Sequence, residues 1–250
     1  MRMDREPGAL GCLLDCLPAP VRVRLLPDLQ RVSLPAGRVL QEIHVVPSHV
    51  YFITDGFLSL TYVTANGDTG EVASAGNEGL VGLAAFLGEG TMSEMRAVVR
   101  TPGTAHALRA EVAAREFRRE PAFQAMVMRH MHWTLAQLAQ AAICSRHHPI
   151  ERQLARWLLL GFDRMRDEPL LVTHETLASL LGVRREGVTE AARRLQDAGA
   201  ISYSRGCIRL EDRAALEQRA CECYGRLHRQ YAALVQCAVS HGPADPVDLR

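Results

Sequence analysis

The chain has 250 residues, 48% hydrophobic content and a formal net charge of +1. This length allows one or two domains with apolar cores, and the near-neutral charge means that any nucleic-acid site must be a local patch. No apolar run reaches the roughly 18 to 20 residues of a membrane span, and the N-terminus lacks the apolar core of a secretory signal. We therefore expect a cytoplasmic protein that does not bind a membrane.

The cysteine and arginine contents give two further indications. The seven cysteines are an odd number without a repeated framework, which indicates free thiols in a reducing compartment. All 29 basic residues are arginine. Codon bias explains this composition, and the alternative is that guanidinium groups are used for phosphate and guanine contacts.

The region from about Arg31 to Leu108 has the pattern of short strands. The runs "VYFITDG" and "FLSLTYV" are separated by Asp55-Gly56, and "TANGDTG" contains an Asn66-Gly67 turn. Two more strands are predicted at "RAVVR" and "TAHAL", and a short helix at residues 80–87. The pattern predicts an antiparallel β-sandwich or barrel.

Helices are predicted after this region. "AEVAAREFRREP" ends at Pro121, and a long helix without internal Gly or Pro follows it. That helix has an apolar stripe at near-heptad spacing, which predicts a dimer seam; the alternative is packing on its own β domain. The stripe comprises Phe123, Val127, Met131, Thr134, Leu135, Leu138 and Ala142.

A second domain is expected after Pro149. "IERQLARWLLLGFDRM" predicts one helix, and "THETLASLLGVRREGVTEAARRLQDAGA" predicts two short helices split at Gly182, with Thr173 as the N-cap of the first. The last helix would bury Val188, Ala191, Ala192 and Leu195. "ISYSRGCIRL" then predicts two strands, which would form a wing beside a helix-turn-helix.

The outer face of the last short helix is rich in charge. Between Gly182 and Arg209 six arginines stand against three acidic residues, a local net charge of +3. Arginine can donate two hydrogen bonds to guanine, and glutamate can accept one from cytosine, so the pattern predicts binding to double-stranded DNA. The alternative is an ordinary solvated face. The predicted DNA-binding residues are Arg184, Arg185, Glu186, Thr189, Glu190, Arg193 and Arg205.

The order of these elements resembles the Crp/Fnr family of bacterial transcription regulators. The resemblance covers roughly Arg31 to Leu210 and is most specific at "GVRREGVTEAARRL". It implies an α+β fold with an antiparallel β-roll (a jelly-roll that is like cyclic-nucleotide-binding domains), a long dimerisation helix and a winged helix-turn-helix. It also implies a homodimer on an inverted-repeat operator, with RNA polymerase as a further partner if the protein is an activator.

The resemblance also implies roles for single residues. Arg185 and Glu186 stand where the family commonly has base-reading residues, whereas Glu190 stands where several members have a second base-reading arginine. In the effector region "NEGLVGLAAFLGEGTMSEMRAVV", Glu78 and Arg96 are candidate effector-binding residues. Met95 occupies the position of the family's phosphate-binding arginine, so we do not expect control by cyclic AMP.

No cofactor and no metal site are predicted. The family's iron–sulfur members have several N-terminal cysteines, whereas this chain has only Cys12 and Cys16 there. A redox role for these two cysteines is left open, as is a metal site formed by Cys221 and Cys223 with His228. The pair His147-His148 is expected to be a polar hinge, because it lacks a complete ligand set.

Five segments are expected along the chain. They are an N-terminal extension (1–30), a β-roll sensor-like domain (31–118), a dimerisation helix (119–146), a winged helix-turn-helix domain (147–212) and a helical extension with a tail (213–250). The protein is not expected to be an enzyme. The alternatives are a winged-helix module that binds proteins, and a cupin-like enzyme, whose metal-binding His-x-His the β region lacks. The signal, the operator sequence and the sign of regulation stay open.

Overall fold

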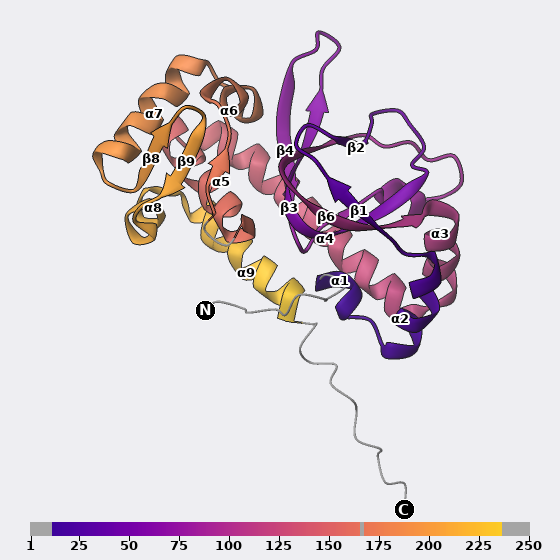
Figure 1. Cartoon of the computed structure of the whole chain (residues 1–250). Coiled ribbons are helices and arrows are strands. Elements are labelled where there is room, and N and C mark those ends of the chain that lie inside the picture. Colours follow the sequence, from indigo (N-terminus) through magenta and orange to yellow (C-terminus); the bar gives the residue numbers. More distant parts are fainter. Residues whose placement is uncertain (1–11, 166–167, 237–250) are drawn as a thin grey trace, which may run out of the picture.

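One half of the molecule is built mainly of strands and the other mainly of helices, and one long helix runs from one half to the other (Figure 1). The structure, a computed structural model, describes residues 12–165 and 168–236. The tail "SHGPADPVDLR" and Cys237 lie outside the described residues, as does the side chain of Cys12. Within the described ranges, no helix combines the length and the apolar character needed to cross a bilayer.

The predicted antiparallel β-roll is confirmed. Its sheet has the order β1-β6-β3-β4, with β2 paired to β6 and β5 paired to β3. The strands are β1 (Gln30–Leu34), β2 (Val39–Gln41), β3 (His49–Val63), β4 (Thr69–Ala75), β5 (Leu80–Val81) and β6 (Arg96–Arg109). The Asn66-Gly67 turn joins β3 to β4, with Gly67 at φ +86°.

Two strand boundaries differ from the prediction. Asp55-Gly56 is not a break between strands, because β3 continues through it, and β6 likewise includes both "RAVVR" and "TAHAL". The register of the two strands shifts around Asp55, so they bend there together. A Cβ atom on Gly103 would lie 2.1 Å from the Asp55 carbonyl oxygen, so this close approach requires glycine.

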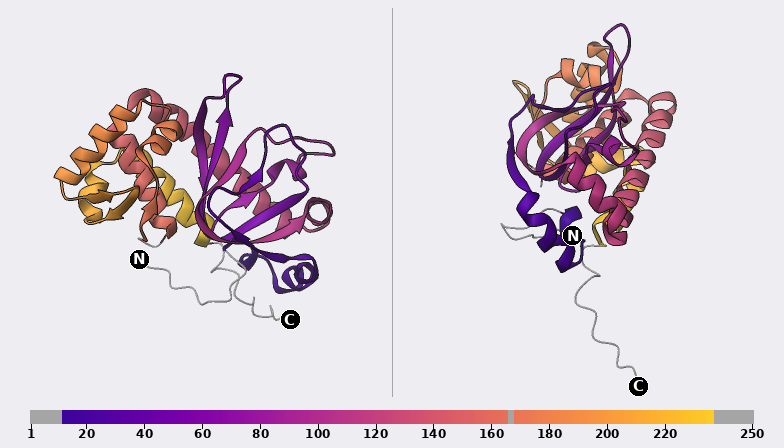
Figure 2. Two further views of the ribbon diagram at one scale, coloured as in Figure 1. Left: turned by 45° about the horizontal axis from the view of Figure 1, so that its top comes forward. Right: turned by 90° about the vertical axis from the view of Figure 1, so that its right-hand side faces the viewer.

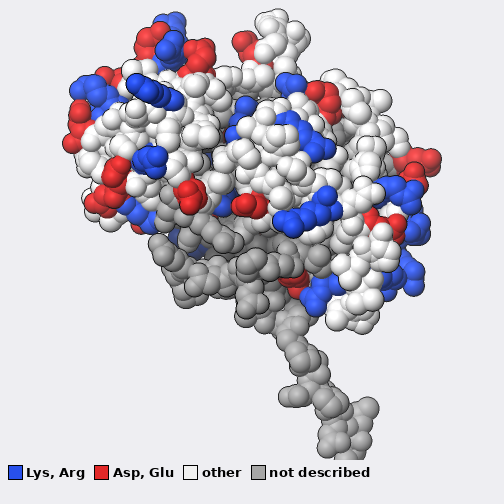
Figure 3. All heavy atoms as spheres, viewed as in Figure 1, with Lys and Arg blue, Asp and Glu red and all other residues white. Residues whose placement is uncertain are grey.

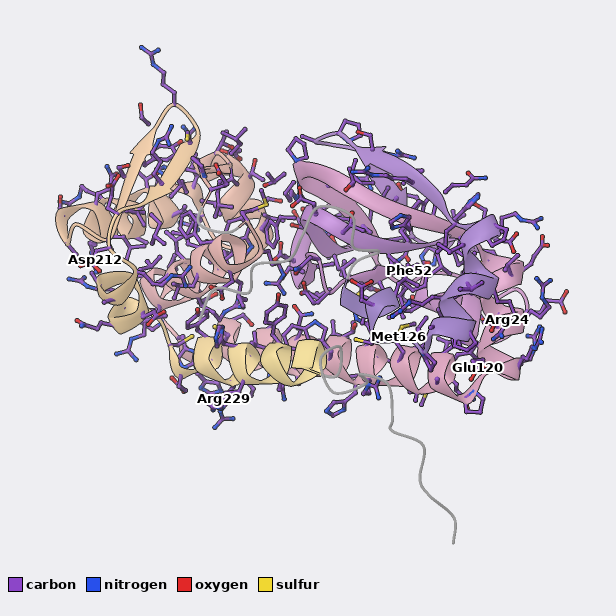
Figure 4. All side chains as sticks on the ribbon, turned by 60° about the horizontal axis from the view of Figure 1, so that its bottom comes forward. Arg24, Phe52, Glu120, Met126, Asp212 and Arg229 are labelled. Carbon is purple, nitrogen blue, oxygen red and sulfur yellow. The ribbon has the colours of Figure 1, made fainter. Side chains whose placement is uncertain are left out.

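Short helices close the ends of the roll. The sequence predicts residues 1–30 only as an N-terminal extension, and the described part of this segment contains α1 (Cys12–Asp15), α2 (Ala19–Leu25) and the 3-10 turn η1 (Leu26–Asp28). The helix expected at residues 80–87 is instead β5 followed by the 3-10 turn η2 (Leu83–Phe86). Arg24 of α2 forms ion pairs with Glu116 and Glu120, at the end of the molecule where Figure 4 labels Arg24 and Glu120.

Two helices cover one side of the roll, α3 (Ala110–Arg119) and α4 (Pro121–His147). Figure 2 shows α4 along the sheet from two further directions. Phe123, Met126 and Val127 of α4 are buried against Phe52 and its neighbours in the sheet, and Figure 4 labels Phe52 and Met126 in these facing layers. The alternative interpretation of the stripe is therefore correct for its buried part.

The exposed apolar face of α4 coincides with the predicted seam only at Leu135 and Ala142. Phe123, Val127 and Thr134 of the predicted seam are buried within the chain itself, because α4 has apolar residues on two faces rather than one. The outer apolar face is formed by Met128, Leu135 and Ile143, which are 54%, 63% and 52% exposed, and by the exposed Ala139 and Ala142.

The helical half contains the predicted helix-turn-helix and wing. Its elements are α5 (Ile150–Met165), β7 (Leu170–Leu171), α6 (His174–Leu181), α7 (Arg185–Asp197), β8 (Ile201–Ser204), β9 (Cys207–Leu210), α8 (Arg213–Arg219) and α9 (Glu222–Gln236). The sequence prediction missed β7, which adds a third strand to the wing sheet in the order β7-β9-β8.

A buried ion pair joins the two halves. The Arg164 guanidinium of α5 donates to Glu78 Oε1 from Nε (2.9 Å) and Nη2 (2.6 Å), and both side chains are almost fully buried. Gly76 leaves room for this arginine, since a Cβ there would lie 2.5 Å from Arg164 Cγ. Nearby, Trp157 Nε1 donates to Glu71 Oε1 at 2.8 Å.

A small sulfur cluster lies apart from the larger cores. Cys144 near the end of α4 packs with Cys221 and Cys223 at the start of α9. The Cys221 thiol, as a hydrogen-bond donor, and then the Arg156 guanidinium lower the pKa of Cys144 to about 5, against the opposing effect of burial. The cluster is described again below.

His130 of α4 is buried beneath the sheet, where its Nε2 accepts a hydrogen bond from the Leu80 backbone N–H at 3.3 Å. Burial lowers its pKa to about 4 from an ordinary value of 6.5. The folded protein therefore keeps His130 neutral in a pH range where the unfolded chain protonates it.

We predict a loss of stability in mild acid because of His130. The unfolded state binds the extra proton below about pH 6.5, so the free energy of unfolding should fall by up to about 1.4 kcal/mol per pH unit as the pH decreases toward 5. His130→Gln, which keeps an acceptor for Leu80, should remove this part of the slope in denaturant titrations. His132→Gln on the exposed side of α4 is the matched control and should keep it. An unchanged slope in His130→Gln would contradict this assignment.

Candidate nucleic-acid interface

Two local features shape the helix-turn-helix. Thr173 caps α6, because its Oγ1 accepts a hydrogen bond from the Thr176 N–H at 3.1 Å. Gly182 ends α6 in the left-handed conformation at φ +66°. α7 then buries Val188, Ala191, Ala192 and Leu195, as the sequence predicts.

The predicted contact residues share the outer surface of α7 and the wing. Arg184 is the N-cap residue of α7, and Arg185 and Glu186 lie in its first turn. All seven predicted residues are exposed, and they comprise Arg184, Arg185, Glu186, Thr189, Glu190, Arg193 and Arg205. The buried apolar face of α7 thus leaves one continuous polar face toward solvent.

The arginines of α7 differ in how strongly they are held. Arg193 donates to Glu190 and to Asp197, each at 3.0 Å, and these partners raise its pKa. Among the described residues, the Arg185 guanidinium makes a long contact, 3.8 Å from its Nε to Glu175 Oε2, between two exposed side chains. Arg185 is therefore freer to reach an external partner than Arg193 is.

The Glu190 carboxylate is hydrogen-bonded to two neighbouring arginines. Its Oε1 accepts hydrogen bonds from Arg193 Nη2 at 3.0 Å and from Arg194 Nε at 3.2 Å. These two guanidinium groups lower the pKa of Glu190. The acid thus neutralises part of the local positive charge. In Figure 3, basic and acidic side chains alternate over the region of α6 and α7.

The wing presents Arg205 at its tip. β8 and β9 are joined by Arg205 and Gly206, which both have positive φ, +49° and +79°. This is the backbone of a two-residue hairpin turn whose twist matches the strands. Arg205 is exposed, so its guanidinium extends from the wing rather than packing on it.

His174 connects the three parts of this surface, and sequence reasoning missed it. Its ring stacks on Tyr203 of β8 at 4.1 Å, and its Nδ1 lies 3.1 Å from Thr189 Oγ1. The Thr189 hydroxyl donates to the Arg185 carbonyl, so His174 Nδ1–H is the donor toward Thr189. Burial, and secondarily Arg185, lower the pKa of His174. Its position directly after the Thr173 N-cap was the available sequence signal.

A second feature is a cavity of about 320 Å³ between the β-roll and α4. Its walls are mainly apolar and include Leu60, Leu83, Met95, Leu135 and Leu138. Among the described residues that line it, none is basic. Ser93 also lines it, and the Ser93 Oγ is buried without a hydrogen-bond partner in the described part of the chain.

The two predicted effector residues lie elsewhere. Glu78 is bound to Arg164 at the junction of the two halves, and Arg96 forms an ion pair with Glu42, with Nε 3.1 Å from Oε2. Neither lines the cavity, whereas Met95 does. The structure does not bring Glu78 and Arg96 together.

Comparisons with known proteins agree with this architecture. Residues 152–219 match the family model of the Crp-like helix-turn-helix domain. A protein of Eubacterium rectale, proposed to be a Crp/Fnr-family transcriptional regulator, is similar in structure with a TM-score of 0.66 and 18% identity, over 82% of this chain and 96% of that one. A Crp/Fnr-family transcriptional regulator of Thermus thermophilus has a TM-score of 0.63 and 22% identity, over 76% and 98% of the two chains.

A third solved structure is similar over a comparable share of the chain. The c-di-GMP-responsive global regulator CLP of Xanthomonas campestris has a TM-score of 0.61 and 16% identity, over 78% of this chain and all 100% of that one. No curated protein sequence matches this chain. At 16 to 22% identity, structural similarity establishes the fold. The resemblance to the Crp/Fnr family is therefore confirmed for the fold and, by the family model, for the helix-turn-helix domain.

Proposed function

Residues 152–219 are a Crp-like helix-turn-helix domain within a Crp/Fnr fold, and on this premise we propose that the protein is a sequence-specific, DNA-binding transcription regulator. The observation that carries the proposal is the surface of α7. Its apolar residues are all turned inward, and its exposed arginines and Glu186 stand beside a wing with Arg205 at the tip. An α-helix with such a face fits the DNA major groove.

The freedom of each side chain suggests a division of roles. Arg185, at the start of α7 and weakly held, is suited to a bidentate contact with guanine. Arg205 on the wing is suited to a phosphate, where it would add affinity without base preference. Arg193 and Glu190 are committed to each other, so their contribution to base reading should be smaller.

We propose a homodimer through the outer face of α4. Met128, Leu135 and Ile143 form an apolar face that nothing in the described chain covers, although more than half of each side chain is exposed. A second copy of α4 offers the matching apolar surface, and a two-fold axis between two α4 helices would present two α7 helices to an inverted repeat. Leu135 also lines the cavity, so the contents of the cavity would touch the dimer face.

The cavity favours an uncharged signal over cyclic AMP. An anionic phosphate in a partly buried site needs a charge-assisted partner, and no described lining residue supplies a cation. Arg96 already pairs with Glu42 on the outside. An apolar molecule with one polar group facing Ser93 fits the lining better. The protein-interaction module and the cupin-like enzyme have no specific observation in their favour.

The decisive experiment on function is selection of bound DNA from a random pool by the purified protein. The proposal expects an enriched inverted repeat whose half-sites lie about 10 to 10.5 base pairs apart, centre to centre, or a multiple of that distance. A pool without enrichment, with the protein folded, would support the protein-interaction alternative.

Arg185→Ala should weaken binding to the selected site by roughly 1 to 3 kcal/mol and relax the preference at one base position per half-site. Arg205→Ala should weaken binding to selected and unrelated DNA alike. It should also reduce the slope of log K against log salt concentration by about 1 for each arginine removed from a phosphate. Fluorescence anisotropy over a salt series measures both effects. An equal loss of base preference in the two variants would refute the division of roles.

Leu135→Glu combined with Ile143→Glu should give a monomer in sedimentation, because two charges would be placed in an apolar seam. Leu171→Glu changes a residue with 62% exposure in β7 and is the matched control, which should stay dimeric. Val127 is unsuitable for this test, since it is fully buried and a charge there would unfold the chain. A dimer that persists in the double variant would place the interface elsewhere.

Titration calorimetry with cyclic AMP and cyclic GMP at millimolar concentration should show no saturable binding, because the cavity lacks a cation for the phosphate. Arg96 is the nearest arginine in sequence to the predicted phosphate position. Micromolar binding that Arg96→Ala abolishes would show that the assignment of Met95 to this position is wrong.

A further inference from the structure

Four potential metal ligands meet where α4 ends and α9 begins. Cys144 and His148 are four residues apart near the end of α4, and Cys221 and Cys223 stand at the start of α9. The three Sγ atoms and one ring nitrogen of His148 all lie within 4.8 Å of one another. The cysteines are buried, and the His148 side chain is only 11% exposed. From this arrangement we propose that the protein binds one zinc ion through these four side chains.

The distances fit a tetrahedral site. Zinc lies about 2.3 Å from thiolate sulfur and about 2.0 to 2.1 Å from imidazole nitrogen, so a tetrahedron has edges of about 3.8 Å between two sulfurs and about 3.6 Å between sulfur and nitrogen. Cys144 Sγ and Cys221 Sγ are 3.6 Å apart, and Cys223 Sγ and His148 Nδ1 are also 3.6 Å apart. These two distances match the edges of a zinc tetrahedron, and the other ligand atoms, all within 4.8 Å of one another, would have to approach by no more than about 1 Å.

The chemistry of the donors selects the metal class. Three thiolates and one imidazole are soft and intermediate donors without a carboxylate, which disfavours Mg²⁺ and Ca²⁺ and suits Zn²⁺. Four protein ligands also leave no open position for water. A Cys3His set of this kind is a structural site rather than a catalytic one.

Neighbouring groups support the ligands as they do in zinc proteins. His148 directs Nδ1 to the sulfurs while its Nε2 lies 3.3 Å from Glu222 Oε1, the carboxylate–histidine arrangement that orients a ligating imidazole. Gln140 Nε2 donates to Cys223 Sγ at 2.7 Å. Arg156 lies beside Cys144, so its positive charge would offset the net negative charge of three thiolates and one Zn²⁺.

A disulfide explains the arrangement less well. Joining Cys144 to Cys221 would require the sulfurs to close from 3.6 Å to about 2.05 Å, and Cys223 and His148 would then have no role. His228, the histidine that sequence spacing suggested as a partner, lies instead with Nδ1 3.5 Å from Asp163 Oδ2. The histidine at the cluster is His148, from the opposite helix.

The site would hold α9 against α4. Cys144 and Cys221 are 77 residues apart in sequence, and the whole winged helix-turn-helix lies between them. α9 runs beside the end of α4 in Figure 4, where Arg229 marks α9. Zinc at this point would fix the end of α4 just before α5 begins. It would also fix the start of α9, which follows the wing and α8 in the chain.

Cobalt titration of the reduced, metal-free full-length protein tests the proposal. One equivalent of Co²⁺ should produce the intense visible bands of tetrahedral cobalt and a thiolate charge-transfer band, and one equivalent of Zn²⁺ should abolish both. Cys223→Ser and His148→Gln should weaken Zn²⁺ binding by more than 100-fold, on the order expected when a direct ligand is lost rather than a supporting group. Cys207→Ser on the wing and His228→Gln are the matched controls and should bind as the wild type does.

Glu222→Gln separates support from ligation. It should keep the cobalt spectrum and weaken Zn²⁺ binding by roughly 10- to 100-fold, because only the orientation of His148 is affected. The cobalt spectrum of the wild type tests the proposal even if a ligand variant does not fold. The proposal fails if the wild type gives no tetrahedral spectrum, if the folded ligand variants bind as the controls do, or if thiol-blocked protein contains a Cys144–Cys221 disulfide and takes up no metal.

Discussion

The arrangement of the two halves depends on the buried pair of Glu78 and Arg164. A charged side chain that leaves water needs a close partner, and each of these two is the other's principal partner across the junction. Glu78 Oε2 has no hydrogen-bond partner among the described residues, so the carboxylate depends on Arg164 through Oε1 alone. Removing either partner from such a pair typically costs about 3 to 5 kcal/mol, because the remaining charge stays buried.

This pair also positions the proposed DNA-binding face of α7 relative to the roll. Arg164 belongs to α5, and α5 packs directly on α7. A shift of α5 at the junction would therefore move α7 and its exposed face. Trp157 extends the same contact through its hydrogen bond to Glu71 and its edge contact with Phe57, whose ring centroid lies 5.4 Å away. The packing of α4 connects the cavity to the roll, since residues of this helix both line the cavity and cover the sheet.

The two ends of α4 are held by different chemistry. At its start, Glu120 and Glu116 bind Arg24, and in its middle His130 is buried as a neutral acceptor beneath the sheet. At its end, Cys144 and His148 face Cys221 and Cys223 of α9. A helix held in this way can transmit a displacement along its length, because a packed helix moves as a rigid element rather than bending at each residue. Its uncovered apolar face then lies between two anchored ends.

The sequence by itself determined the elements whose signals are local. The Thr173 cap, the Gly182 stop and the apolar spacing of Val188 to Leu195 predicted α6 and α7, because capping and helical periodicity act within a few residues. Strand patterns likewise predicted an antiparallel sandwich or barrel, and the family resemblance implied that it is a β-roll. Helical periodicity predicted the exposed arginines of α7. Only the tertiary structure decided which face of α4 is buried, since Val127 and Leu135 are equally apolar and differ in what packs on them. It also decided that β3 and β6 bend at Gly56 and Gly103 instead of ending, and that Arg164 meets Glu78. The tertiary structure likewise brings Cys144 and His148 together with Cys221 and Cys223. Contacts between residues far apart in the chain depend on how whole helices pack, and local spacing in the sequence does not encode that packing.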